Sequence, residues 1–379
     1  MSVVTHEERL ARVALNRLGE PGETKMTGLV AELGPVRLRQ LLLAESDLDG
    51  LSEEVAARRD DLDAERELER AERQGLRFVV PGDAEWPTQL GDLLGAGALN
   101  DRGGVPIGLW VKGPLRLDAL ATSLAVVGAR AATTYGDEVA SEIAATAAQA
   151  GHVVVSGGAF GIDRAAHRGA VAAGAPTVAV VACGADRVYP SAHAVMFEHI
   201  ARTGAIVSEA PPGAAPLKIR FLARNRLIAA LSVGTVVVEA AIRSGSLNTA
   251  HWAGILNRPV MGVPGPVTSA ASGGVHEHLR AGDMSLVTCG ADVLELVSPA
   301  GEHLVEPAWD EATLRDRLTP RQRQVIDAVP VVSPAGSDSI ARTAGLGVRE
   351  VQGALTALQT VGLVEINRGG WRLTALART

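Results

Sequence analysis

Short apolar runs alternate with longer amphipathic segments through the middle of the chain. The run 153–155 is three valines, followed by a glycine-rich turn and an Ala-rich segment with helical spacing. Such continuous apolar runs are typical of strands buried on both faces, and their alternation with helices favours a parallel sheet. The predicted strands are 124–127, 153–155, 177–182, 205–208, 235–240 and 260–263. The predicted helices are 136–150, 163–173, 191–203, 220–231 and 246–256. We therefore predict an α/β fold with a doubly wound parallel sheet.

The first 75 residues have a different pattern. Segments 6–20 and 25–45 carry leucines at three- and four-residue steps, and Gly34-Pro35 interrupts the second of them. A densely charged helix of mixed sign is expected over 52–74, most simply as a solvated face. Residues 1–75 are therefore predicted to form a small helical module, and the α/β domain is expected over 76–297, where the first strands begin.

The last part of the chain changes character again. Residues 298–317 show no clear periodicity and contain two prolines, which is typical of a linker. Residues 318–379 then show three helical segments and a terminal hairpin with a glycine turn. This order predicts a winged helix-turn-helix. Between 319 and 379 there are seven arginines and four acidic residues, a net charge of +3.

Composition limits the classes of protein that the 379 residues can form. The net charge of −7 argues against a generally basic surface but leaves room for a local basic groove. The two cysteines, Cys183 and Cys289, are far apart and have no metal-ligand spacing. Since no signal peptide or membrane-spanning run is evident, we expect a soluble cytoplasmic protein.

The turns after the predicted strands are the first candidates for chemistry, because ligands of doubly wound sheets bind at the carboxyl ends of the strands. The turn 156–161 has the spacing S-x-G-x-x-G and opens a helix, which favours binding of a phosphate at the helix N-terminus. A plain strand-to-helix turn is the alternative. After the strand 124–127, Gly128 lets the backbone approach a ligand closely, and the guanidinium of Arg130 can donate several hydrogen bonds to a phosphate.

A cluster of cations over 218–226 is the strongest indication of nucleic-acid binding. It contains one lysine, three arginines and Phe221, one of only four phenylalanines. Cations that follow a phosphate backbone, with a ring that stacks a base, suit single-stranded nucleic acid. The alternative is a surface helix whose Arg224 or Arg226 pairs with Glu209 or Glu239. We expect both, with about two arginines structural and the rest free.

Other titratable residues give weaker signals. Asp163 and His167 would share one helix face, where a hydrogen bond that closes the turn is preferred over an acid–base pair. His276 and His278 alternate at a strand-like step but have no third ligand nearby, so no metal or other cofactor is predicted. No nucleophile–base arrangement is visible, and we expect a protein that is not an enzyme.

Several motifs in order resemble one known family. They are GARAATTYG (128–136), SGGAFGIDRAAH (156–167), Tyr189-Pro190, SEAPPG (208–213), RFLARNRLIAALS (220–232), VVVEAAIRSGSLNTAHWAG (236–254) and VPGP (263–266). Together they are similar to the DNA-processing protein A family (DprA, also Smf). Weaker similarity lies upstream, at 83–90 and 109–113.

The resemblance implies an extended Rossmann-like domain, flanked by a small N-terminal helical domain (SAM or helix-hairpin-helix-like) and a C-terminal winged helix. It implies binding of single-stranded DNA, protection of incoming strands, loading of RecA recombinase in natural transformation, and a homodimer formed through this domain. Single-strand-binding protein is a further expected partner. By motif position the DNA pocket would consist of Arg130, Ser156, Gly157, Gly158, Gly161, Lys218, Phe221, Arg224, Asn225 and Arg226. The turn and the cation cluster add Gly128 and Arg220.

Two other functions are compatible with the same pattern. One is a nucleotide hydrolase resembling the lysine-decarboxylase-like phosphoribohydrolases, for which Glu239 is the candidate catalytic carboxylate. The other is a transcription factor whose winged helix reads duplex DNA. The run of four cations favours single-stranded DNA, because a small nucleotide does not require it.

Overall fold

The computed structural model describes residues 4–44, 51, 55, 58, 62–304, 314–315 and 317–378. The chain divides into two compact units, residues 1–305 and 306–379. They are described separately below.

A nine-stranded sheet forms the centre of the first unit. In spatial order its strands are β1 (Leu76–Val79), β4 (Leu109–Lys112), β8 (Ala205–Ser208), β7 (Thr177–Val181), β6 (Val154–Ser156), β5 (Leu124–Val127), β9 (Gly234–Val237), β10 (Val260–Gly262) and β11 (Ser285–Leu286). Strand β4 pairs antiparallel with both β1 and β8, and the other neighbouring pairs of this sheet are parallel. From β5 the chain proceeds outward through β6, β7 and β8 and then returns to β9 on the other side of β5. This reversal is the topological switch point of a doubly wound sheet.

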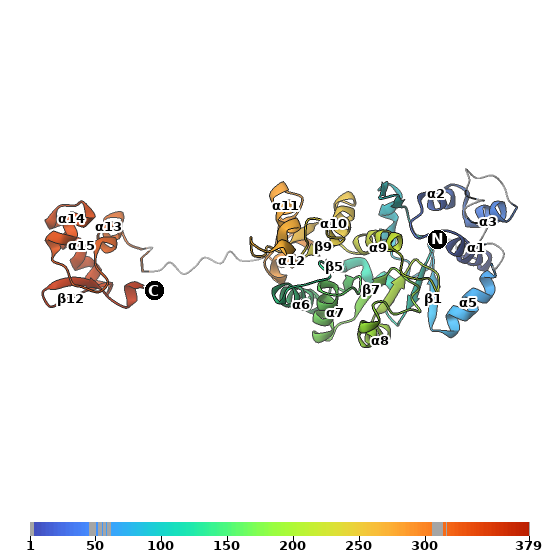
Figure 1. Ribbon diagram of the computed structural model, residues 1–379, viewed down its shortest axis with the longest axis horizontal. Coiled ribbons are helices and arrows are strands. Elements are labelled where there is room, and N and C mark those ends of the chain that lie inside the picture. Colours follow the sequence, from blue (N-terminus) through green and yellow to red (C-terminus); the bar gives the residue numbers. More distant parts are fainter. Residues whose placement is uncertain are drawn as a thin grey trace. The chain divides into compact units, whose positions relative to one another are not determined.

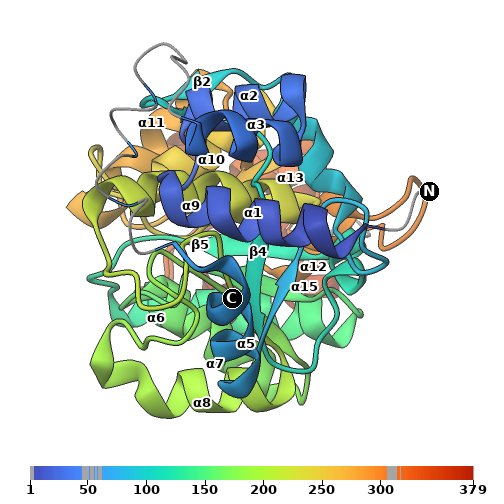
Figure 2. The same ribbon diagram turned by 90° about the vertical axis from the view of Figure 1, so that its right-hand side faces the viewer.

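Helices cover both faces of the sheet (Figure 1 and Figure 2). On one face lie α6 (Thr134–Gln149), α7 (Ile162–Ala172) and α8 (Ala194–Thr203), and on the other lie α9 (Lys218–Leu231) and α10 (Ser246–Ile255). Strand β5 supplies both cores, because Leu124 and Val126 pack with α6 and α7 while Ala125 and Val127 pack with α9 and α10. The predicted α/β fold class is confirmed, with each of its predicted helices and strands present within a few residues.

The N-terminal helices are α1 (His6–Leu18), α2 (Thr24–Leu33), α3 (Pro35–Leu43) and α5 (Ala64–Arg73). The break at Gly34-Pro35 is confirmed, since Gly34 has φ +78° and Pro35 opens α3. Much of the predicted charged helix over 52–74 lies outside the described residues. Helix α1 packs Leu15 and Leu18 among α2 and α3, and Val13 and Ala14 against α5 and the sheet edge. The domain boundary at residue 75 stays a prediction.

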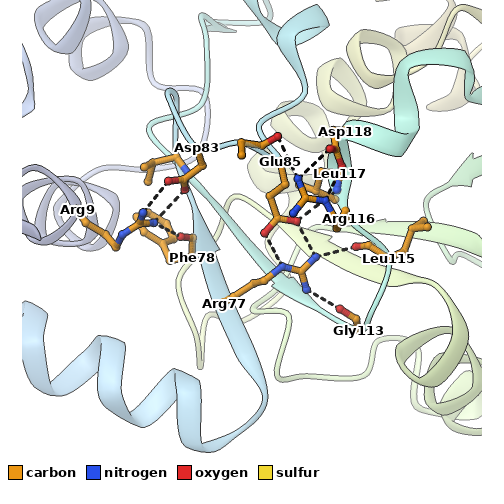
Figure 3. Close-up of polar contacts among 12 residues, drawn as sticks. Arg9, Arg77, Phe78, Asp83, Glu85, Gly113, Leu115, Arg116, Leu117 and Asp118 are labelled. Atoms are coloured by element: carbon orange, nitrogen blue, oxygen red, sulfur yellow. Dashed lines mark hydrogen bonds and ion pairs between the residues drawn. The ribbon is translucent and has the colours of Figure 1, made fainter. Parts of the chain in front are cut away.

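Polar anchors hold this edge of the sheet. The side chain of Arg9 on α1 donates to both carboxylate oxygens of Asp83, at 3.0 and 2.6 Å, and to the carbonyl of Phe78. Nearby, Arg77 of β1 donates to both oxygens of Glu85 at 2.8 and 3.0 Å, as Figure 3 shows. The 83–90 segment therefore fixes α1 and β1 in place.

Smaller elements complete this unit. They are β2 (Ala98–Leu99), β3 (Arg102–Gly103), α11 (Gly273–Ala281), α12 (Gly290–Val297) and the 3₁₀ helices η1 (Thr88–Leu94), η2 (Leu117–Thr122), η3 (Ser191–His193) and η4 (Ala270–Ser272). The strand-like interpretation of His276 and His278 is wrong, because both lie on α11. The reason is the apolar pair Val275 and Leu279, four residues apart, which packs against the core.

The second unit has the elements α13 (Pro320–Ala328), α14 (Ser337–Ala344), α15 (Val348–Thr360), β12 (Val364–Asn367), β13 (Gly370–Leu373) and η5 (Leu376–Arg378). Thr319 caps α13 in a capping box with Gln322. The order of three helices and an antiparallel hairpin is as predicted, and the winged-helix assignment stays a prediction. Of the predicted linker 298–317, residues 305–313 and 316 lie outside the described residues. No helix in the described ranges is long and apolar enough to cross a membrane.

Candidate nucleic-acid interface

A cleft of about 670 Å³ lies at the switch point, beside the carboxyl ends of β5 and β9. We call it the α9 cleft, because α9 supplies much of its wall. Its lining consists of Val127, Gly128, Ala129, Arg130, Ala159, Asp163, Lys218, Phe221, Leu222, Arg224, Asn225, Ile228, Ala241, Arg243, Ser244, Gly245, Ser246 and Thr249. Six of the twelve predicted site residues are among them: Gly128, Arg130, Lys218, Phe221, Arg224 and Asn225. The position follows the rule for ligand sites in doubly wound sheets.

One face of α9 turns toward the cleft. Lys218, Phe221, Asn225 and Ile228 recur at three- and four-residue steps, which places them in one row along the helix. Lys218 is exposed in the first turn. Asn225 is buried and donates to the carbonyl of Gly245 at 3.2 Å, so it holds the turn after β9 against α9.

Phe221 is neither a core residue nor a freely exposed one. Its ring is half-buried, and the guanidinium carbons of Arg130 and Arg224 lie 5.0 and 5.8 Å from its centroid. These distances fit cation–π contacts. The ring of Tyr189 is centred 5.9 Å away. A base stacked on Phe221 would therefore lie next to two positive charges.

Arg224 is the buried cation of the site. Its Nη1 donates to the carbonyl of Val180 at 3.1 Å, and burial lowers the pKa of its guanidinium, against the opposing charge of Asp163. A Cβ at Gly157 would overlap Nη1 of Arg224, so glycine is needed at that position for this arginine to lie behind the cleft. Gly157 contributes space rather than a surface contact.

Backbone N–H groups of the glycine-rich turn bind the carboxylate of Asp163, a residue of the same chain. Oδ2 of Asp163 accepts the N–H groups of Gly157 and Ala159 at 3.2 and 3.3 Å. Burial raises the pKa of this carboxyl, with Arg224 and these N–H groups opposing the shift. The preferred role of Asp163, closing the turn, is confirmed. His167 hydrogen-bonds instead to Thr177 Oγ1 at 2.8 Å and so makes no acid–base pair with Asp163.

The other residues of the turn lie behind the cleft or beside it. The hydroxyl of Ser156 is fully buried and donates to the carbonyl of Val126 at 2.7 Å. Gly158 is buried against Phe197. Gly161 has φ +73°, and a Cβ there would overlap the carbonyl of Ala129. It lines a shallow neighbouring hollow that shares Arg130 with the cleft.

Arg220 and Arg226 do not reach the cleft. Arg226 is fully buried and donates through Nη1 and Nη2 to the two carboxylate oxygens of Glu209, both at 2.6 Å. Arg220 donates to both oxygens of Glu20 at 2.8 and 3.0 Å. The predicted pairing of Arg226 with Glu209 is confirmed. The expectation that the cations other than two structural arginines are free is wrong for Arg224, which is buried and donates to the carbonyl of Val180. The Arg220–Glu20 pair fastens the N-terminal segment to α9, and Glu209, held by Arg226, also accepts the N–H of Gly22 at 3.2 Å.

Glu239, the carboxylate required by the hydrolase alternative, is buried at the start of α6. It accepts hydrogen bonds from the backbone N–H of Thr133 at 2.9 Å and from the Thr133 hydroxyl at 2.6 Å. It does not line the α9 cleft. Within the described ranges no group of three His, Cys, Asp or Glu residues is placed to hold a metal ion.

Three residues near the site were missed by the sequence analysis. Arg243, exposed in the turn after β9, lines the cleft. Phe160 and Tyr189 are 45% and 44% exposed, an unusual position for rings in a chain with only six Phe and Tyr residues. The position of Phe160 inside the glycine-rich turn could have indicated that it lies near the site. The Tyr189-Pro190 pair, already part of the family motifs, could have indicated the same for Tyr189.

Comparison with known proteins places the chain in a family. Residues 77–298 match the family described as DNA recombination-mediator protein A. The chain belongs to this family. A putative DNA processing protein DprA from Mycobacterium tuberculosis is 43% identical over 362 residues, which cover 95% of this chain and 92% of that protein. Protein Smf from Escherichia coli is 35% identical over 305 residues, 79% of this chain and 78% of that protein.

Two solved structures of DprA proteins are also similar. DprA from Streptococcus pneumoniae aligns with a TM-score of 0.62 and 30% identity, over 79% of this chain and all of that chain. DprA from Helicobacter pylori, described for its mode of binding single-stranded DNA, aligns with a TM-score of 0.51 and 27% identity, over 59% of this chain and 96% of that chain. The predicted resemblance to the DprA family is confirmed.

Proposed function

We propose that the α9 cleft binds single-stranded DNA. The observation that carries this proposal is the half-buried ring of Phe221, which has the guanidinium groups of Arg130 and Arg224 within 5.8 Å of its centroid and shares the cleft with the exposed Lys218. Cations attract the phosphates, and a ring offers a stacking surface to any base, so that affinity depends little on sequence. The description of the H. pylori relative supports this assignment.

The biological role we propose is recombination mediation. The protein would protect incoming or exposed single strands and load a RecA recombinase onto them in natural transformation and recombination. The family description supports mediation. A homodimer through the Rossmann-like domain, and contact with single-strand-binding protein, are parts of this proposal that rest on the family resemblance and carry no assigned residues.

We propose further that the protein acts without catalysing a reaction on DNA. The support is the engagement of Glu239, whose two carboxylate oxygens accept hydrogen bonds from Thr133 at the N-terminus of α6. A carboxylate held in this way is part of the fold. Release of free base from nucleoside monophosphates by the purified protein would contradict the proposal and favour the hydrolase.

The test of DNA binding is a comparison of an oligo-dT strand, a duplex of equal length and free nucleotides. We expect preference for the strand, and a linear fall of log affinity with log salt of about 0.7 for each phosphate contacted. Arg130→Gln and Lys218→Gln should each reduce that slope by roughly 0.7. Fluorescence anisotropy between low and moderate salt measures both.

Arg202→Gln is the matched control, since Arg202 is exposed on α8, on the opposite face of the sheet. It removes one charge and should leave the slope unchanged. Equal affinity for strand and duplex, or a slope that neither cleft variant alters, would refute the α9 cleft as the binding site.

A further inference from the structure

A second basic hollow, of about 740 Å³, lies between the N-terminal helices and the loop before α9. Its charged lining residues are Arg17, Arg58, Arg70, Arg220, Glu20 and Asp186. We call it the N-terminal hollow. It is separate from the α9 cleft and shares no lining residue with it.

Both carboxylates of the N-terminal hollow are already engaged. Glu20 accepts from Arg220 at 2.8 and 3.0 Å and from Arg58 at 3.0 Å. Burial would raise the pKa of Glu20, but these arginines outweigh it and hold the carboxyl below its usual range. Asp186 accepts the N–H of Gly213 at 2.9 and 3.0 Å and fixes the loop.

Among the described residues that line the hollow, four guanidinium groups face two carboxylates, which gives this lining a net positive charge. Arg17 donates to the carbonyl of Pro212 at 3.2 Å, and its ion pair with Glu67 spans 3.7 Å, too long for a hydrogen bond. Burial raises the pKa of Glu67, with the charges of Arg17 and Arg70 opposing the shift. Arg70 is exposed on α5. The hollow is thus suited to an anion.

The first turn of α9 forms the wall between the two basic sites. Leu217 and Arg220 line the N-terminal hollow, whereas Lys218 and Phe221 line the α9 cleft. Leu217 and Ile219 are exposed on this ridge. A helix with its side chains is about 10–12 Å across, a distance that a few nucleotides span.

We infer that the N-terminal hollow binds a second stretch of the same single strand, through its phosphates, after the strand crosses the first turn of α9. This inference rests on the proposed function of the α9 cleft. None of the described residues that line the hollow is aromatic, so these residues contact the phosphate backbone and do not stack bases. The α9 cleft thus binds the strand through base stacking and charge, whereas the N-terminal hollow binds it through charge alone.

Oligonucleotide length tests the inference. In Arg58→Gln/Arg70→Gln, we expect unchanged affinity for a six-nucleotide oligo-dT, which fills the α9 cleft alone. For a twenty-nucleotide oligo-dT we expect weaker binding, with a salt slope smaller by about 1.4, equivalent to two lost phosphate contacts. The wild-type protein should gain affinity between the two lengths, and the variant should lose most of that gain.

The matched control is Arg66→Gln/Arg73→Gln, which removes the same charge from exposed positions of α5 outside the hollow. An effect of equal size in the control, an equal loss on a twenty-base-pair duplex, or an unchanged long-oligonucleotide affinity would each overturn the inference. The last result would leave the hollow open to an acidic protein partner. Phe221→Ala separates the two proposals: if it leaves both oligonucleotides bound normally, the proposed function of the α9 cleft fails.

Discussion

Both faces of α9 carry cations, but the fold engages those cations differently on the two faces. On the face toward the N-terminal helices, Arg226 and Arg220 are each held by both oxygens of a carboxylate. On the face toward the cleft, Lys218 is exposed, and the ring of Phe221 lies among guanidinium groups. The Arg220–Glu20 pair on one face fastens two parts of the fold together, and the other face lines the α9 cleft.

The difference teaches that a cluster of cations in sequence does not by itself mark a binding surface. What decides the role of each arginine is whether the fold brings a carboxylate within hydrogen-bonding distance. Glu20 supplies that carboxylate to Arg220, and Glu209 supplies it to Arg226. Exposed charge that remains after such pairing is what can attract a phosphate backbone.

Removing the buried charge of Arg226 should have the largest effect. Arg226→Ala leaves Glu209 buried without its partner, which costs about 3–5 kcal/mol of unfolding free energy for an ion pair of this kind. Urea unfolding measures the loss. Lys218→Ala, on the other face of the same helix, should change stability by less than about 0.5 kcal/mol. Similar losses of unfolding free energy in the two variants would contradict the proposed difference between the two faces of α9.

Phe221→Ala tests the face of α9 that lines the cleft, through its effect on DNA binding. Loss of a stacking ring should reduce affinity for oligo-dT by about 1–3 kcal/mol while the salt slope stays the same, because no charge is removed. Phe78→Ala, in the core, should instead lower stability by about 3–5 kcal/mol and leave binding by the folded protein unchanged. A large drop in the melting temperature of Phe221→Ala, with normal binding by the folded fraction, would make Phe221 a core residue.

A smaller effect, on the pH dependence of the free energy of unfolding, is expected from His167, which is buried behind the α9 cleft. Burial lowers the pKa of His167 to about 3, with the charges of His193 and Arg224 adding to the shift. The unfolded chain takes up this proton near pH 6.5 and the folded protein does not. Stability is therefore lost as pH falls below about 6.5, by roughly 1.4 kcal/mol for each pH unit.

His167→Gln provides the comparison for this prediction. Thr177 Oγ1 gives its proton to the carbonyl of Val154 at 2.7 Å, so Nδ1 of His167 is the donor to Thr177, and a glutamine amide supplies a similar donor. Asp163, whose raised pKa acts in the opposite direction, is present in both proteins and cancels. Unfolding curves at pH 7, 6 and 5 should diverge between the two proteins. Parallel pH profiles would show that His167 does not titrate differently on folding.

Much of the fold was predictable because strands buried on both faces leave an unmistakable apolar run. Strand β5, for example, was predicted with the bounds that it has, 124–127. The helix α11 was not predicted as such, because its two histidines alternate while its apolar residues Val275 and Leu279 are few. Short elements at the sheet edge, such as β11, leave too few residues for any period to show.

The candidate site was predictable in part. The role of Asp163 followed from its place at the start of α7, within reach of the turn before it. The pairing of Arg226 with Glu209 was an open alternative, since the two are 17 residues apart. Arg220 was out of reach of sequence reasoning, because its partner Glu20 lies 200 residues away and nothing local announces it.

One buried hydrogen bond bears on how the chain folds during synthesis. Asn16 of α1 donates to the carbonyl of Glu209 at 2.6 Å across 193 residues, and also accepts from the indole of Trp110 at 2.8 Å. At about 5–20 residues per second, the ribosome needs roughly 10–40 s to supply the second partner after the first. The buried hydrogen bonds of helix α1 are therefore complete only when more than half of the chain has been synthesised.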